Sequence, residues 1–270
     1  GDALLQDGVA TSPAAAAHCV NDTQGSVVFI RAVYAAIKAA QARFTQAPVE
    51  VLYAGCGPFA TLLLPLLGRF EAGELTVHLL DIHQRSLDSV GLLISDFGLQ
   101  AHRISCSQGD ACDYQHPTHP HVIIAETMQK SLEQEPQFAV TANLAPQLHP
   151  QGIFIPQQIE VDLCLAKLSE ETAAVKRGDT LDSEALIAAG KRRRLATALC
   201  LIPSQAATLM QQASQNSAGL FELNPIHLSM PTTADLSDFE PVLFTRVRAF
   251  EQHQLLDYES EITLPLRCTE

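Results

Sequence analysis

A glycine turn and an acidic strand end are the features of this sequence that are best suited to chemistry. Gly55, Cys56 and Gly57 follow an apolar run, and Asp81 closes the next apolar run. Glycines in such a turn let backbone amides approach a ligand at the N-terminus of the following helix. A carboxylate at the end of the second strand can accept hydrogen bonds from both hydroxyls of a ribose. Together they predict a ligand that contains adenosine with a free ribose.

Each of these positions also has a purely structural explanation. A glycine turn of this kind occurs in sheets that bind no ligand at that place. Asp81 could instead cap the helix that follows it. Asp110, after the third predicted strand, could meet an adenine amino group at the other rim of the crevice, or it could be a turn residue beside Gly109.

The elements that must position these residues alternate between strands and helices. Short apolar stretches predict strands at residues 49–54, 75–82, 102–108, 121–126 and 152–157. Apolar positions at helical spacing predict helices at residues 27–44, 58–70 (broken near Pro65), 84–99 and 136–148. Because strands that alternate with helices need crossover connections, we expect an α/β fold. It is a Rossmann-like, doubly wound, mostly parallel sheet with helices on both faces.

The pattern changes after residue 156, and we predict three parts. Residues 1–46 are expected to form an N-terminal helical lid, and residues 47–157 the ligand-binding Rossmann-like domain. Residues 158–270 are expected to form a C-terminal part of mixed strand and helix, for substrate binding or dimerisation.

Within the C-terminal part, the strand and helix signals are uneven. Residues 157–168 predict a strand that leaves the first sheet, and residues 204–215 predict a helix. Residues 183–202 are ambiguous. Residues 241–268 predict two strands joined by a polar turn around residues 257–259.

The glycine turn and the two acids together resemble the class I S-adenosylmethionine-dependent methyltransferases. In that family the turn contacts the methionine part of the cofactor, the acid ending strand two binds the ribose, and the acid after strand three lies at the adenine. The resemblance implies S-adenosyl-L-methionine as cofactor and S-adenosyl-L-homocysteine as product. It implies a cofactor site of Tyr53, Gly55, Cys56, Gly57, Asp81, Ile82, Asp110, Ala111 and Glu126. The family usually has an acid where this chain has Tyr53, and a third glycine of the turn is missing.

A longer stretch, residues 122–166, narrows the resemblance to the protein arginine methyltransferases. Glu126 ends a strand and Glu135 follows nine residues later, as in the double-glutamate loop of that subfamily. The segment LHPQGIFIP then keeps the prolines and the glycine that precede a strand leaving for a β-barrel. The resemblance implies that Glu126 and Glu135 are catalytic: they orient a cationic acceptor and accept its proton. Glu133 is an alternative second acid, and both roles could instead be structural.

Two motifs of that subfamily are altered in this chain. The N-terminal helix motif keeps Asp22 and Phe29 but has Gly25-Ser26 in place of an Arg-Thr pair, whose arginine normally steadies the methionine carboxylate. Arg31, one turn later, could replace that arginine or be a surface charge. The chain contains no tryptophan, so the Thr-His-Trp loop that helps to build the arginine pocket is missing. These changes argue against specificity for protein arginine.

We therefore expect methyl transfer from S-adenosylmethionine to a nitrogen or oxygen of a small-molecule or peptidic acceptor. Two alternatives stay open. The sulfonium could serve cyclase or aminocarboxypropyl chemistry that releases methylthioadenosine. The chain could also be a non-catalytic relative that binds the cofactor or a partner.

Composition limits the expected partners and compartment. The formal net charge is −13, so we expect no nucleic acid partner. No apolar run is long enough to span a membrane, and the N-terminal stretch lacks the regions of a signal peptide. Seven cysteines without a C-x-x-C pair predict buried thiols in a reducing compartment, so we expect a cytoplasmic protein. A homodimer stays open.

Two further clusters have structural explanations that we favour. His116, His119 and His121 have a metal-like spacing, but a zinc site would need further ligands and we expect no metal. The basic run at residues 191–194 is expected to be a solvated face or an ion-pair patch in an acidic protein.

Overall fold

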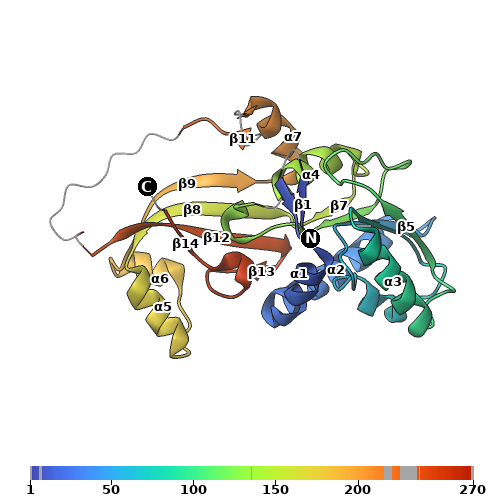
Figure 1. The fold of residues 1–270 in the computed structure, drawn as a ribbon, viewed down its shortest axis with the longest axis horizontal. Helices are drawn as coiled ribbons and strands as arrows, with labels where there is room; N and C mark the ends of the chain where they lie inside the picture. The colour runs from blue at the N-terminus through green and yellow to red at the C-terminus, as the bar shows by residue number, and fades with distance from the viewer. Residues whose placement is uncertain are drawn as a thin grey trace.

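Two β-sheets organise the chain (Figure 1). The computed structural model describes residues 2–5, 8–134, 136–215, 221–225, 236 and 238–268. The first sheet is parallel, with the strand order β5-β4-β3-β6-β7. Its strands are β3 (Val49–Ala54), β4 (Leu75–Asp81), β5 (Arg103–Gln108), β6 (Val122–Ala125) and β7 (Ile153–Ile155). This confirms the predicted α/β, Rossmann-like fold.

The direction of winding reverses beside β3. The chain runs from β3 to β4 and β5 on one side, and then returns to β6 and β7 on the other. Open sheets of this kind leave a crevice beyond the carboxyl ends of the strands at the reversal. The glycine turn follows β3, Asp81 ends β4 and Glu126 follows β6. The topology therefore brings these three predicted site elements to the same edge.

One face of the parallel sheet packs against α2 (Thr23–Arg43) and α3 (Gln84–Asp96). Asp22 caps α2, because its side chain accepts a hydrogen bond from the amide of Gly25 at 3.0 Å. The helix therefore begins before the predicted start at residue 27. Its buried stripe, with the spacing of three and four residues that a helix requires, is Phe29, Ala32, Val33, Ala36, Ile37 and Ala40.

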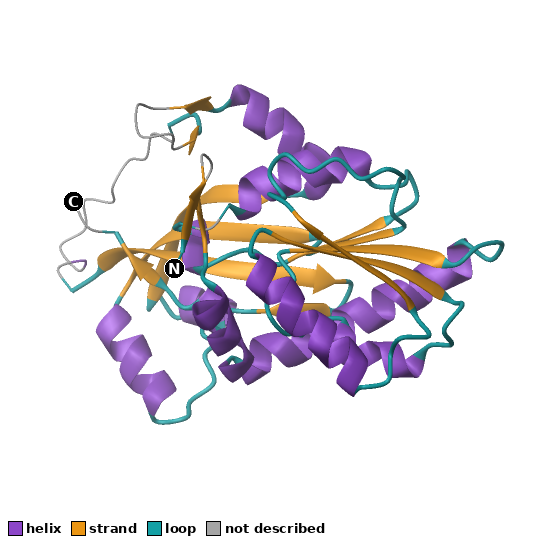
Figure 2. Cartoon of the chain, turned by 45° about the vertical axis from the view of Figure 1, so that its right-hand side comes forward, coloured by secondary structure: helices purple, strands orange, loops and turns teal. Residues whose placement is uncertain are grey.

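The opposite face of the sheet packs against α4 (Gln137–Leu144), which continues as the short 3₁₀-helix η4 (Ala145–Gln147). Val140 and Leu144 of α4 share a core cluster with Leu52, Ile123 and Phe154 of the sheet. Helices thus cover both faces, which Figure 2 shows from a second direction. The strands are consequently apolar on both sides, as parallel strands generally are.

The helix predicted at residues 58–70 is wrong. This segment forms turns followed by a 3₁₀-helix, η2 (Leu64–Arg69). Ala60 has a positive φ of 43° and Pro65 has no amide hydrogen to donate, so a continuous α-helix cannot form. The leucines of the segment are buried in the main core instead, which explains why its apolar pattern resembled a helix.

The second sheet is antiparallel, with the order β13-β12-β8-β9 and with β14 beside β12. Its strands are β8 (Gln158–Ala166), β9 (Arg192–Leu201), β12 (Glu240–Phe250), β13 (His253–Leu255) and β14 (Leu266–Arg267). The helices of this part are α5 (Leu168–Lys176), α6 (Ser183–Ala188) and α7 (Pro203–Gln212). The ambiguous residues 183–202 therefore contain a helix and a strand.

The predicted turn of the last hairpin is misplaced. The strands β12 and β13 are joined at Glu251, whose φ is 49°, and not around residues 257–259. Residues 257–259 instead lead into a 3₁₀-helix, η6 (Glu261–Thr263), which begins with a capping box of Ser260 and Thr263. The polar residues 257–259 therefore belong to the turn that precedes η6, and not to the hairpin between β12 and β13.

The N-terminal residues contain strands as well as helices. An antiparallel hairpin of β1 (Ala3–Leu5) and β2 (Gly8–Ala10) precedes α1 (Pro13–His18) and the 3₁₀-helix η1 (Cys19–Asn21). Two short strands, β10 (Ser214–Gln215) and β11 (Phe221–Glu222), form a small separate pair. None of the helices in the described ranges combines the length and apolarity needed to cross a membrane. The boundaries of the three predicted parts remain a prediction.

A buried arginine joins the elements of the second sheet. The guanidinium of Arg192 binds Glu171 of α5 at 2.7 Å and also pairs with Asp257, and all three residues are at most 6% exposed. It lies 3.6 Å from the ring centroid of Phe244. Tyr258 donates its hydroxyl to the same Glu171 carboxylate at 2.7 Å. Within the basic run of residues 191–194, Arg192 therefore forms ion pairs, and these ion pairs are buried.

We expect Arg192→Met to lower the free energy of unfolding by about 3–5 kcal/mol, because it leaves two buried carboxylates without their cation. The matched control is Arg193→Met, an exposed neighbour on the same strand, which should change it by less than about 0.5 kcal/mol. Urea denaturation of both variants measures the difference. Equal effects of the two substitutions would show that the buried network is not stabilising.

Candidate cofactor site

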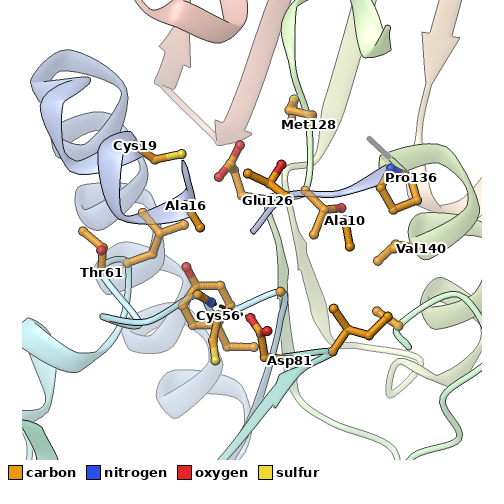
Figure 3. A pocket seen from close by; sticks show the side chains of 18 of the residues that line it. Ala10, Ala16, Cys19, Cys56, Thr61, Asp81, Glu126, Met128, Pro136 and Val140 are labelled. Atoms are coloured by element: carbon orange, nitrogen blue, oxygen red, sulfur yellow. Dashed lines mark hydrogen bonds between the residues drawn. The ribbon is translucent and has the colours of Figure 1, made fainter. Parts of the chain in front are cut away.

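All nine predicted cofactor positions line a single cavity at the carboxyl edge of the parallel sheet (Figure 3). They are Tyr53, Gly55, Cys56, Gly57, Asp81, Ile82, Asp110, Ala111 and Glu126. They come from four separate strand ends, so their convergence is a product of the sheet topology. Their binding roles stay a prediction.

The glycine turn has backbone conformations that favour glycine. Gly55 and Gly57 have φ values of 67° and 63°. A side chain on Gly55 would also clash with Cγ2 of Thr127 from the loop after β6. At Gly57 the nearest atom to such a side chain is Cβ of Ala16, at 3.9 Å. Gly55 is therefore required for packing, whereas Gly57 presents bare backbone toward the cavity.

The carboxylate of Asp81 holds two turns together. Oδ2 accepts a hydrogen bond from the amide of Gly57 at 2.8 Å, and Oδ1 accepts one from the amide of His83 at 2.8 Å. Asp81 does not occupy the N-cap position of α3, because that position falls on His83. Each carboxylate oxygen can accept a second hydrogen bond, so a ribose hydroxyl pair is compatible with these bonds.

Asp110 closes a similar turn after β5. Its Oδ1 accepts the amide of Cys112 at 2.9 Å, which is the structural role that the sequence left open. The neighbouring Gly109 amide donates to the carbonyl of Asp81 at 3.0 Å. The turns after β4 and β5 are thus connected through the backbone.

Two side chains of the cavity wall are kept neutral by burial. Burial raises the pKa of the Tyr53 phenol well above its ordinary value, and nearby Cys56 and Glu126 raise it further. Burial likewise raises the pKa of the Cys56 thiol, with a further contribution from Asp81. Because burial favours the neutral thiol, Cys56 is poorly suited to act as a thiolate nucleophile.

Glu126 reaches into the cavity between the N-terminal segment and Met128 (Figure 3). Glu135, the predicted second acid, lies outside the described residues. The alternative, Glu133, is exposed and does not line the cavity. The loop that carries these acids is docked on the second sheet, because the amide of Ser131 donates to Oγ1 of Thr245 at 3.0 Å.

Several cavity residues were not predicted from the sequence. The hairpin contributes Val9 and Ala10, and η6 with its cap contributes Ser260, Glu261 and Ile262. They are remote in sequence from the glycine turn and belong to no motif that we recognised. The Ser-x-x-Thr pattern of the capping box marks η6 as a helix start, but it carries no information on the cavity.

A clasp between Asp22 and residues 260–261 joins the two ends of the chain over the cavity. Oδ2 of Asp22 accepts hydrogen bonds from the hydroxyl of Ser260 and from the amide of Glu261, the latter at 2.9 Å. A side chain on Gly25 would lie 2.6 Å from this Oδ2 and 2.8 Å from the Ser260 hydroxyl. The clasp therefore explains glycine at position 25. Arg31 is exposed and lies outside the cavity lining, so it does not replace the missing arginine.

One buried polar atom at the cavity has no protein partner among the described residues. It is Nε2 of His83, a residue that lines the cavity next to Asp81. Buried polar atoms are rarely left without a hydrogen bond, and a bound ligand is one explanation for such an atom. This atom, the bare Gly57 backbone and the Asp81 carboxylate fit an adenosine-containing cofactor.

The histidine run has protein partners of its own. His116 bonds Glu50 at 3.2 Å, His119 bonds the carbonyl of Gln147 at 3.0 Å, and Nδ1 of His121 accepts the Glu50 amide at 2.9 Å. Among the described residues no group of three or more His, Cys, Asp or Glu could hold a metal ion.

The cysteines differ from the prediction of buried thiols. All seven lie in the described ranges and none of them forms a disulfide, but only Cys56 and Cys164 are buried. Cys19 and Cys106 are exposed, since a position in an apolar run does not by itself decide which face of an element it occupies.

The fold is shared with solved protein arginine methyltransferases. Trypanosoma brucei PRMT1, in an enzyme–prozyme heterotetrameric complex with AdoHcy, is 14% identical, with 93% of this chain and 83% of that chain covered and a TM-score of 0.54. Arabidopsis thaliana protein arginine methyltransferase 10 is 15% identical, with the same coverages and a TM-score of 0.51. No protein-family model and no curated protein matches the sequence. The chain thus shares the fold of these two protein arginine methyltransferases, with a parallel sheet followed by an antiparallel sheet.

We expect Gly55→Ala to lower the free energy of unfolding by about 2–4 kcal/mol, through its positive φ and the clash with Thr127. Gly57→Ala should cost only about 1–2 kcal/mol, because it adds the φ penalty without a clash. Thermal or urea unfolding measures both values.

The double variant Gly55→Ala/Thr127→Ser tests the cause. Serine removes Cγ2 and keeps the hydroxyl, which bonds Oε1 of Gln137 at 3.1 Å. The double variant should therefore recover the part of the lost free energy of unfolding that the clash with Cγ2 causes. No recovery relative to Gly55→Ala would rule out the proposed clash.

Proposed function

We propose that the chain is an S-adenosylmethionine-dependent methyltransferase that acts on a nitrogen or oxygen of a small-molecule or peptidic acceptor. The single observation that carries this proposal is the convergence, on one cavity of a methyltransferase-type fold, of the nine positions that the sequence resemblance implied. The T. brucei neighbour was solved with AdoHcy, which supports the choice of cofactor.

The residues of the cavity have complementary roles in this proposal. Asp81 would accept both ribose hydroxyls, while Asp110 and Ala111 would border the adenine. The bare backbone at Gly57 would allow close approach of the cofactor. S-adenosylmethionine, when bound, supplies an electrophilic methyl group. The protein must then hold an acceptor in line and exclude water, because productive methyl transfer depends on orientation.

Glu126 would orient the acceptor in this proposal. Its side chain enters the cavity from the loop after β6, beside the walls formed by the glycine turn and the N-terminal segment (Figure 3). A carboxylate at this place can hold a nitrogen or hydroxyl donor and accept the proton that it loses. Glu135 remains the proposed second acid.

Calorimetric titration with S-adenosylmethionine and S-adenosylhomocysteine tests cofactor binding. We expect saturable binding of both, and Asp81→Asn should weaken it by roughly tenfold or more, because two ribose hydrogen bonds to a charged acceptor become weaker. The control is Asp96→Asn, an exposed acid of the same helix–strand unit. Absence of binding in the unmodified chain would refute the proposal.

We expect Glu126→Gln to reduce turnover by roughly a hundredfold or more, while S-adenosylhomocysteine still binds. The assay offers amines, guanidines, phenols, carboxylic acids and arginine peptides with S-adenosylmethionine, and mass spectrometry identifies the nucleoside product. S-adenosylhomocysteine supports methyl transfer. Methylthioadenosine as the main product would instead support the alternative use of the sulfonium, and full turnover of Glu126→Gln would contradict its assigned role.

Oligomerisation is part of the proposal because the T. brucei neighbour is heterotetrameric. A homodimer stays open for this chain, and light scattering at several protein concentrations measures its oligomeric state.

A further inference from the structure

The charge of the cavity is unusual for a ligand that carries a carboxylate. Five acidic residues line it: Asp22, Asp81, Asp110, Glu126 and Glu261. None of the 17 lysines and arginines does, although all of them lie in the described part of the chain. The residues left undescribed therefore cannot supply such a cation. His83 is the single basic side chain among the described lining residues.

Three of the acids have only neutral partners in the hydrogen bonds that hold them. Asp22 accepts from two amides and a serine hydroxyl, Asp81 from two amides, and Asp110 from one amide. Amides and hydroxyls solvate a carboxylate without cancelling its formal charge. The field inside the cavity is consequently negative, and partial burial weakens its screening by water.

Position 25, at the start of α2 beside the cavity, has no space for a cationic side chain while Asp22 and Ser260 keep their places. Gly25 has no room for even a Cβ beside Asp22 and Ser260, and Arg31 is exposed outside the cavity. The N-terminus of α2 would attract an anion, but the Asp22 carboxylate already occupies the Gly25 amide. No lysine or arginine in the described cavity therefore compensates a carboxylate on the ligand, and His83 is the one basic side chain among the described lining residues.

We infer that the cavity selects adenosyl sulfonium ligands by their positive charge and does not require their carboxylate. The chemical class is an adenosyl sulfonium with an amine and no carboxylate, of which decarboxylated S-adenosylmethionine is the simplest. It carries one more positive charge than S-adenosylmethionine itself. This inference rests on the proposed function, since it concerns the ligand of the same site.

Four ligands separate the effect of the carboxylate from that of the sulfonium. They are S-adenosylmethionine, S-adenosylhomocysteine and the decarboxylated form of each, titrated calorimetrically into the full chain. In both pairs we expect the decarboxylated ligand to bind as tightly or up to roughly tenfold more tightly, and this preference to shrink as salt is added. Decarboxylated ligands that bind more than about threefold more weakly would overturn the inference.

A pair of variants assigns the preference to the cavity. Glu261→Gln removes one charge from the cavity rim and should reduce the preference for the decarboxylated ligands. Glu71→Gln removes the same charge from an exposed position outside the lining and should leave it unchanged. If both variants changed the preference for decarboxylated ligands equally, the inference would be overturned. The preference would then come from the net charge of the whole protein and not from the cavity.

The outcomes also separate this inference from the proposed function. If none of the four ligands binds, the proposed function fails and the inference fails with it. If both carboxylate-bearing ligands bind and their decarboxylated forms bind weakly, the proposed function stands and only the inference is overturned.

Discussion

The carboxylate of Asp81 is the constraint on which the site depends. It is buried at the end of β4, and its two oxygens accept the amides of Gly57 and His83 at 2.8 Å each. A buried carboxylate must keep its hydrogen bonds, so the turns after β3 and β4 cannot separate without a large free-energy cost. The carbonyl of the same residue accepts the amide of Gly109, which ties the end of β5 to the others. One residue thereby fixes three strand ends around the cavity, and any ligand hydroxyl must be accommodated beside these bonds.

The second sheet completes the cavity through a chain of polar contacts. Arg192 pairs with Asp257, three residues before Ser260, and the Ser260 hydroxyl binds Asp22 at the start of α2. The buried ion network therefore holds the segment that reaches the cavity, although it lies at some distance from the glycine turn. Fixing both ends of the chain in this way costs conformational entropy, which the buried apolar contacts of α2 with β12 and β13 offset.

Local patterns predicted the parallel sheet and its site because each strand end carries its own signal. The strand at residues 49–54 and the acid at position 81 could be read from short windows, and parallel topology then brings them together. The wrong predictions arose where the local sequence pattern was ambiguous. Residues 58–70 are mostly apolar, so a buried irregular segment could not be distinguished from a buried helix by its pattern. Ser260 and Val9 reach the cavity only through tertiary packing, which no local pattern contains.

Packing between the two ends of the chain restricts the residue at position 25. Asp22, Ser260 and Glu261 fill the space in which a longer side chain would lie. The same packing places two acids, at positions 22 and 261, along the cavity lining. Backbone requirements such as the positive φ of Gly55 preserve the fold, while the side chains that decide the charge of the site are free to change.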